Sequence, residues 1–224
     1  MNDDIIAIDG PAASGKSTVA RGVARELGYL YLDSGALYRG VTWQALERNI
    51  RVTDGSALVG LVADLKVEFA VADGAIRFSM DGTPLGIEIR APRVDAKVSP
   101  VAATPGVRQA VVRWLRQAVT LGPLVTEGRD IGTAVFPDAR HKFYLDASPK
   151  ERARRRYGEL AERTETVTRD DVDRALRQRD AMDSERQVDP LRVAPNAIVI
   201  DTTALLIDDV VRKIVAIVRE SSDA

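Results

Sequence analysis

The segment "GPAASGKS", residues 10–17, fits the pattern Gly-x-x-x-x-Gly-Lys-Ser/Thr and dictates how the chain on either side of it folds. It follows the apolar run "IIAID" and precedes "KSTVARGVAREL", in which Val19, Val23 and Leu27 recur every four residues. This arrangement predicts a buried strand, a tight loop and an amphipathic helix that ends near Gly28. Glycines let the backbone N–H groups of such a loop turn inward, and the helix N-terminus adds its dipole. The segment therefore predicts a site for the phosphates of a nucleoside triphosphate.

Two side chains of this loop have separate predicted tasks. Lys16 brings a positive charge to the β- and γ-phosphates, and the Ser17 hydroxyl is a ligand for Mg²⁺. A carboxylate at the end of an apolar strand is expected beside the metal, and Asp33, Glu127 and Asp146 are the candidates. Because Glu127 continues into "GRD", which is unusual for a pure metal site, we assign the metal to Ser17 and Asp33. The residues predicted to bind the triphosphate are Gly10, Pro11, Ala12, Ala13, Ser14, Gly15, Lys16, Ser17 and Thr18.

Short apolar runs alternate with helical segments along most of the chain. After the first strand they are "YLYLD", which ends in an Asp-Ser-Gly turn, then "GPLVTEG", "HKFYLD" and "NAIVID". One of the helices between them opens at Thr104 and Pro105 and continues to Leu121, and another begins with a capping box at Ser148. Five short strands separated by helices predict an α/β fold with a five-stranded parallel sheet covered by helices on both faces.

A different pattern interrupts this alternation near residue 66. The runs "KVEFAV" and "IRFSM" alternate apolar and polar residues, with turn residues between them and after the second, and the shorter extended piece "TPLG" follows. They predict a small antiparallel hairpin or three-stranded sheet, inserted into one domain that spans residues 1–224.

The residues that the chain lacks narrow its chemistry. It has no cysteine and a single histidine, His141, which argues against thiolate metal sites, a cysteine nucleophile and multi-histidine centres. No asparagine precedes a lysine, so the Asn-Lys-x-Asp guanine reader of GTPase switches is missing. The net charge of -1 provides no basic field for nucleic acid or an anionic membrane. Without a leader or a long apolar run, the sequence predicts a cytoplasmic protein that has no membrane partner.

Arginines stand where strands are expected to end. Arg39 lies in "LDSGALYRG" and Arg129 in "EGRDIGTAVF", and both would lie at the carboxyl ends of parallel strands, where ligands of such sheets bind. A further group, residues 152–156, opens one helix, and Arg179 and Arg186 flank two aspartates in "RQRDAMDSER". Phosphoryl transfer depends on positioning and charge stabilisation, so distributed arginines favour a kinase whose acceptor is itself phosphorylated.

Five stretches together resemble the bacterial cytidylate kinases. They are "IDGPAASGKST", "YLDSGALYR", "EGRDIGTAVFPDA", "KFYLDAS…ERARRR" and "RQRDAMDSER". The likeness runs nearly end to end and implies a P-loop kinase with the strand order 2-3-1-4-5. It also implies a nucleoside-monophosphate-binding region that includes the insert, at about residues 40–100, and a lid at about residues 150–168. The implied reaction moves the γ-phosphoryl group of ATP to CMP or dCMP with Mg²⁺, in a cytoplasmic monomer.

The resemblance also implies roles for individual residues. The catalytic residues would be Lys16, Arg129, Arg152 and Arg156, the last two within the lid. The residues implied to bind CMP are Ser34, Arg39, Ser99, Arg108, Arg129, Asp130, Arg179, Asp183 and Arg186. Arg39 and Arg129 would hold the acceptor phosphate, and Ser99, Arg108 and Asp130 would line its base.

The base assignment also has a chemical reason. A carboxylate accepts a hydrogen bond from the N4 amino group of cytosine, and guanidinium groups donate to N3 and O2. Asp130 with Arg108 and Arg186 supplies that set, whereas uracil would turn its O4 acceptor toward the carboxylate. Two alternatives stay open: a P-loop kinase for another acceptor such as UMP, AMP or shikimate, and a nucleotide-binding switch with slow turnover.

Overall fold

The core of the protein is a sheet of five parallel strands in the spatial order β2–β6–β1–β7–β8. The computed structural model describes residues 5–162 and 167–222. The parallel strands are β1 (Ile5–Asp9), β2 (Leu30–Asp33), β6 (Leu124–Gly128), β7 (His141–Asp146) and β8 (Ile198–Asp201). Numbered along the chain, this order is 2-3-1-4-5. The predicted parallel sheet and the order that the resemblance implied are both confirmed.

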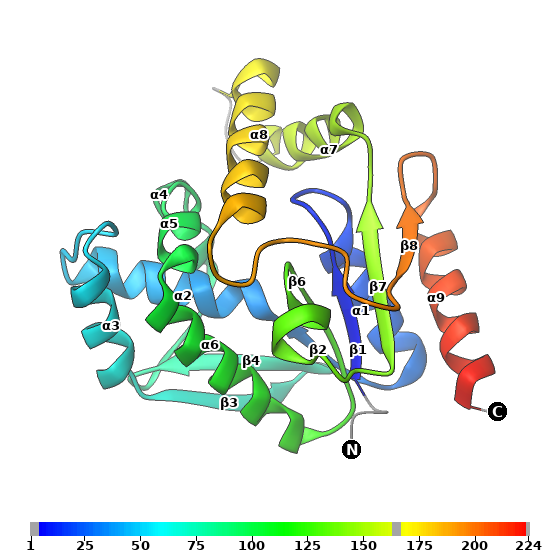
Figure 1. The fold of residues 1–224 in the computed structure, drawn as a ribbon, viewed down its shortest axis with the longest axis horizontal. Helices are drawn as coiled ribbons and strands as arrows, with labels where there is room; N and C mark the ends of the chain where they lie inside the picture. The colour runs from blue at the N-terminus through cyan, green and yellow to red at the C-terminus, as the bar shows by residue number, and fades with distance from the viewer. Residues whose placement is uncertain (1–4, 163–166, 223–224) are drawn as a thin grey trace.

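Helices cover both faces of this sheet (Figure 1). On β1, Ile6 and Ile8 pack in the cluster formed with α1 (Lys16–Leu27) and α9 (Ile207–Ser222), whereas Ile5 and Ala7 pack in the opposite cluster. That second cluster contains side chains of α2 (Ser34–Glu47), α3 (Gly55–Asp64) and α6 (Pro105–Gln117). Alternate residues of a strand point to opposite faces, so a strand buried on both sides is apolar throughout, as "IIAI" is.

The antiparallel insert is part of the same sheet. Strands β3 (Val67–Ala72) and β4 (Ala75–Met80) form the predicted hairpin, and β5 (Thr83–Pro84) adds a short third strand to β4. β4 then pairs in parallel with β2 through Tyr31 and Ala75. The sequence predicted the hairpin but not this junction, which extends the parallel sheet at the β2 edge.

Several local features differ from the sequence prediction. The Asp-Ser-Gly segment is not a free turn, because Asp33 caps α2 and its carboxylate accepts a hydrogen bond from Ala36 N at 3.1 Å. The helix that opens at Pro105 ends at Gln117 and continues as a 3₁₀ segment, Ala118–Leu121. The elements that the sequence analysis did not anticipate are α3, α4 (Pro92–Asp95), α5 (Val98–Ala103), the 3₁₀ segment Ile87–Arg90 and a π-helical turn, Ile131–Val135.

Two further helices stand over the carboxyl ends of the strands: α7 (Pro149–Ala161) and α8 (Arg169–Glu185) (Figure 1). Ser148 caps α7 as predicted, since its hydroxyl accepts from Glu151 N at 3.3 Å. The two helices share a small apolar cluster in which Val172 and Leu176 pack with Ala12 of the glycine-rich loop. Residues 163–166 of the predicted lid lie outside the described residues. No helix in the described part of the chain has the length and apolar character needed to cross a membrane.

Candidate active site

A cleft of ≈ 320 Å³ opens at the carboxyl ends of β1, β2 and β6, where the sequence analysis placed the ligands. It is lined on one side by the glycine-rich loop and α1 and on the other by α2 and α5, with α7 and α8 above. The predicted residues that line it are Ala12, Ala13, Gly15, Lys16, Ser17, Thr18, Asp33, Ser34, Arg39, Ser99, Arg129, Asp130, Arg156, Arg179, Asp183 and Arg186. The sequence therefore anticipated most of the wall of the cleft.

The glycine-rich loop turns sharply because its glycines adopt backbone conformations that other residues avoid. Gly10 has φ 148°, and a Cβ there would lie 2.0 Å from the carbonyl oxygen of Leu145. Gly15 has φ 92° and is the residue before α1. These positions are closed to larger residues, so the loop keeps a curved backbone at the start of a helix, the geometry that binds phosphate.

Lys16 lies buried inside this loop. Its ammonium group donates to Pro11 O at 2.6 Å and lies 3.4 Å from Ser14 Oγ. Burial, and then the positive charge of Arg129, lower its pKa from the ordinary lysine value of 10.5 to about 7, against the opposing effect of Glu127 and Asp9. An incoming phosphate strongly stabilises the charged form of a buried ammonium group, because its negative charge replaces the solvation that burial removed.

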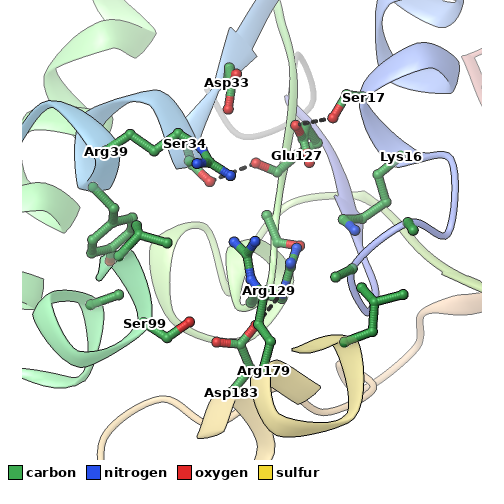
Figure 2. Close-up of a pocket in the computed structure, with 18 of the residues that line it drawn as sticks. Lys16, Ser17, Asp33, Ser34, Arg39, Ser99, Glu127, Arg129, Arg179 and Asp183 are labelled. Atoms are coloured by element: carbon green, nitrogen blue, oxygen red, sulfur yellow. Dashed lines mark hydrogen bonds and ion pairs between the residues drawn. The ribbon is translucent and has the colours of Figure 1, made fainter. Parts of the chain in front are cut away.

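Glu127, at the end of β6, is the carboxylate that meets Ser17. The Ser17 hydroxyl donates to Glu127 Oε1 at 2.7 Å (Figure 2), and Tyr31 Oη lies 3.4 Å from the same oxygen. Asp33 is the neighbour of Glu127 in strand register, but one of its oxygens caps α2 and the other accepts from Arg90 Nη2 at 2.6 Å. Of the three candidate carboxylates, the structure brings Glu127 to Ser17, and the two oxygens of Asp33, to which the sequence analysis assigned the metal, have other partners.

Positive charge concentrates in the middle of the cleft. Figure 2 shows Arg129 and Arg179 between Lys16 on one side and Ser34 and Arg39 on the other. Arg129 Nε donates to Asp183 Oδ2 at 2.8 Å. Arg179 has a buried Nε without a hydrogen-bond partner among the described residues, and burial followed by Arg129 and Arg39 lowers its pKa to about 10. An arrangement of this kind is built for an anion that is not part of the protein.

Asp130 forms the far end of the cleft together with two arginines. Its Oδ2 accepts from Arg108 Nη2 and its Oδ1 lies 3.2 Å from Arg186 Nη2. Burial raises the pKa of Asp130, although both guanidinium groups oppose this. Arg108 is only 1% exposed and lies behind the lining, where Asp189 and Ala102 O also accept from it. The structure therefore brings the predicted base-reading groups together but places Arg108 in support of Asp130.

The arginines at the start of α7 take separate positions. Arg152 donates to Ala12 O at 3.3 Å and pairs with Asp180, and Arg155 donates to Ser14 O at 3.3 Å. Both thus support the glycine-rich loop from behind, and Arg152 does not reach the lining. Arg156 is the predicted lid residue that faces the cleft.

A family model described as "Cytidylate kinase" matches residues 6–220. The chain belongs to the cytidylate kinase family. A cytidylate kinase of Limosilactobacillus reuteri (strain DSM 20016) is 42% identical over 219 residues, which cover 97% of this chain and 96% of that relative.

Other relatives of the cytidylate kinase family are longer. The bifunctional pantoate ligase/cytidylate kinase of Synechococcus sp. (strain RCC307) is 48% identical over 218 residues, 96% of this chain but 43% of that protein. The chain therefore spans less than half of such bifunctional relatives. A solved structure of an uncharacterized protein from Eubacterium ventriosum has a TM-score of 0.52 at 10% identity, covering 96% of this chain and 98% of that one, which supports the shared α/β fold.

One buried carboxylate of this cytidylate kinase family member escaped the sequence analysis. Asp9, at the end of β1, is 3% exposed and accepts from Ile131 N and Gly132 N, each at 2.8 Å. Burial raises its pKa to about 7, against the lowering effect of these two N–H groups. Asp9 thereby fixes the π-helical turn that follows Arg129 and Asp130. Its place between a buried strand and Gly10 was visible in the sequence, but its partners lie 122 and 123 residues away.

Proposed function

We propose that this chain transfers the γ-phosphoryl group of ATP to CMP and dCMP, giving ADP and CDP or dCDP. The observation that carries the proposal is the charge of the cleft, in which Arg39, Arg129 and Arg179 lie across from Lys16 and the glycine-rich loop. Two phosphate-bearing molecules that face each other need cations between them, and a switch that binds one nucleotide does not. Membership of the cytidylate kinase family supports the same reaction.

In the proposed mechanism, the protein positions two phosphates and stabilises the charge that moves between them. An oxygen of the acceptor phosphate attacks the γ-phosphorus, and the bond from that phosphorus to the β–γ bridging oxygen breaks. Lys16 would hold the donor phosphates and Arg39 the acceptor phosphate, and Arg129, which lies between these two side chains in Figure 2, would contact the transferring group. We also propose that residues 150–168 act as the lid, with Arg156 turned to the phosphates, and that residues 40–100 hold the acceptor.

Mg²⁺ is the proposed metal, held at Ser17 and Glu127. The support is the 2.7 Å hydrogen bond between the Ser17 hydroxyl and Glu127 Oε1. It places two oxygen atoms next to each other, and oxygen atoms are the ligands that Mg²⁺ prefers. The described residues contain no cluster of three or more acidic or histidine ligands. Phosphate oxygens and water would complete the coordination, as they commonly do for Mg²⁺ in kinases. When bound, the metal neutralises charge on the phosphates.

Glu127→Gln is expected to raise the Mg²⁺ concentration needed for half-maximal activity about tenfold and to lower kcat by about a hundredfold. The amide can still accept from Ser17 but has lost its charge. Titration of activity with Mg²⁺ at saturating ATP and CMP measures the effect, and Asp33→Asn is the comparison. A larger shift in Asp33→Asn than in Glu127→Gln would return the metal to the original assignment, Asp33.

An acceptor panel tests the proposed reaction. ADP release, measured with CMP, dCMP, UMP, AMP and shikimate as acceptors, is expected to show the highest kcat/KM with the two cytosine nucleotides. Equal rates with all acceptors, or a preference for shikimate, would exclude the proposal in favour of the alternative P-loop kinases. A switch would bind ATP alone in a calorimetric titration, whereas a kinase also binds CMP at a separate site.

Replacing Asp130 is expected to change the base preference. In Asp130→Asn the amide NH₂ can donate to O4 of uracil, so the ratio of kcat/KM for CMP over UMP should fall about a hundredfold. Asparagine is chosen over alanine because an empty space would leave Arg108 and Arg186 without their shared partner, which typically costs about 3–5 kcal/mol of stability. The matched control is Asp189→Asn, which also removes a partner of Arg108 but does not line the cleft. An unchanged CMP-to-UMP ratio in Asp130→Asn would contradict the base-reading role.

Two further parts of the proposal concern the state of the protein. We propose a cytoplasmic enzyme because its proposed substrates, ATP and CMP, are cytoplasmic metabolites, and we propose that it acts as a monomer. Sedimentation velocity at assay concentrations measures the second point, and a stable dimer would contradict it.

A further inference from the structure

Asp95, at the end of α4, lies between two arginines that belong to different walls of the cleft, Arg39 of α2 and Arg156 of α7. Its Oδ1 accepts from Arg39 Nη1 of α2, and its Oδ2 accepts from Arg156 Nη2 of α7 at 2.9 Å. The three side chains are partly buried, with exposures of 22% for Asp95, 13% for Arg39 and 24% for Arg156. One carboxylate thus joins the helix that carries the proposed acceptor-phosphate ligand to the helix that begins the proposed lid.

We propose that Asp95 is a positioning residue. Its carboxylate accepts the hydrogen bonds of Arg39 and Arg156 in the absence of nucleotide, and the acceptor phosphate takes over these hydrogen bonds when the nucleotide binds. The inference rests on the proposed function, because it takes these two arginines to be phosphate ligands. Neither the family comparison nor the sequence motifs assign a role to Asp95.

The geometry supports replacement by a phosphate. Arg39 and Arg156 line the cleft, whereas Asp95 lies at its margin and is not part of the lining. An arginine fork binds a carboxylate and a phosphate oxygen pair in the same way, so the two anions compete for the same N–H groups. A phosphate carries more charge than a carboxylate and can accept from both arginines and from the neighbouring Arg179 at once.

Electrostatics gives the direction of the effect. The pKa of Asp95 is lowered despite its burial, because Arg39, Arg156 and Arg179 all favour the carboxylate. Asp95 therefore carries a full negative charge near the proposed phosphate position and repels an incoming phosphate. At the same time it neutralises a group of cations that would otherwise repel one another in the cleft. Its net effect is to lower the affinity of the cleft for phosphate while holding the guanidinium groups of Arg39 and Arg156 close to each other.

The chain offers a matched control for this contact. Arg93 of α4 pairs with Glu47 of α2, so this second ion pair ties the same two helices together. Neither residue lines the cleft. Glu47→Gln therefore removes an α2–α4 ion pair of comparable chemistry without changing the charge that faces the phosphate.

The experiment compares wild type, Asp95→Asn and Glu47→Gln by calorimetric titration with CMP and with inorganic phosphate. Asp95→Asn is expected to bind both about five- to tenfold more tightly, the size of effect that two partly exposed ion pairs permit. Glu47→Gln should bind them as the wild type does. The apparent KM for CMP should fall in Asp95→Asn, and kcat should fall with it if the tightened product leaves more slowly.

Several outcomes would overturn the inference. Unchanged or weaker phosphate binding in Asp95→Asn means that Asp95 supports Arg39 within the complex or has only a structural role. Asp95→Ser, which has a shorter side chain, must give the same sign as Asp95→Asn, and an opposite sign also refutes competition. The phosphate titration separates this result from the proposed function: tighter phosphate binding without CMP turnover in the wild type would refute the reaction and leave the competition standing.

Discussion

Replacing Lys16 with alanine is expected to lower kcat about a thousandfold while the protein remains folded. Pro11 O holds the ammonium group inside the glycine-rich loop, where Lys16 is buried. An incoming triphosphate would therefore contact this cation. Interactions with a developing charge count most where water is excluded and the group is already in place. Steady-state assays with ATP and CMP measure kcat and both KM values, and circular dichroism checks the fold.

Lys142 supplies the matched control for this substitution. It also donates to the carbonyl oxygen of a proline five residues earlier, Pro137, but it is not part of the cleft. Lys142→Ala should therefore retain turnover close to that of the wild type. A loss of turnover in both variants would point to a general effect of lysine removal, and full turnover in Lys16→Ala would refute the catalytic role.

The pKa of Lys16 adds a readout that does not depend on turnover. Because the folded-state pKa of about 7 is below the ordinary value of 10.5, the unfolded chain binds more protons between these two pH values. Lys16 therefore makes the free energy of unfolding rise as the pH increases from about 7 to 10.5. Below pH 7 its buried charge lowers the free energy of unfolding by the full amount. A triphosphate in the loop should return the pKa upward, so ATP binding near pH 8 should take up a proton. Calorimetry in two buffers of different ionisation enthalpy measures that uptake, which Lys16→Ala should lose.

The parts of the fold that depend on local sequence were predictable. The strand, loop and helix around residues 10–17 follow from apolar spacing and glycine placement, and each later parallel strand contains a short apolar stretch. The pairing of β4 with β2 was not predictable, because a single bridge between Tyr31 and Ala75 makes it. The short helices α4 and α5 also escaped, since a helix of about one turn has too few residues to show a period.

The sequence predicted which residues form the site better than it predicted which of their side chains contact one another. The sequence analysis assigned the metal to Asp33 rather than Glu127, although spacing along the chain does not separate two residues that are neighbours in strand register. The proposal of Glu127 rests on its contact with Ser17 and on the other partners of Asp33, which are the N-terminus of α2 and Arg90. Asp95 could not be identified at all, since its two arginines lie 56 and 61 residues away in sequence. Contacts of this kind depend on the packing of α2, α4 and α7 and leave no local pattern.

Arg129→Ala is expected to lower kcat about a thousandfold, with a smaller rise in the KM for ATP. Its Nε is bound to Asp183 Oδ2 at 2.8 Å, and Nη1 lies 3.3 Å from Gly128 O, so the guanidinium group is held in one orientation. Asp9 fixes the turn that follows Arg129, because it accepts from Ile131 N and Gly132 N. An arginine held from both directions needs no rearrangement as charge develops on the transferring group. Single-turnover rates with saturating ATP and CMP measure the chemical step directly.

Two companion variants decide how Arg129 acts. Arg129→Lys keeps the charge but not the planar fork, so it should recover only part of the lost rate if orientation matters. Arg116→Ala is the matched control, because Arg116 donates to Val135 O and Ala134 O of the same turn but does not line the cleft. If Arg116→Ala slows the chemical step as much as Arg129→Ala does, the effect belongs to the turn as a whole. If Arg129→Lys restores the full rate, a charge at this point is sufficient, and the fixed orientation that Asp183 and Asp9 provide is not needed for transfer.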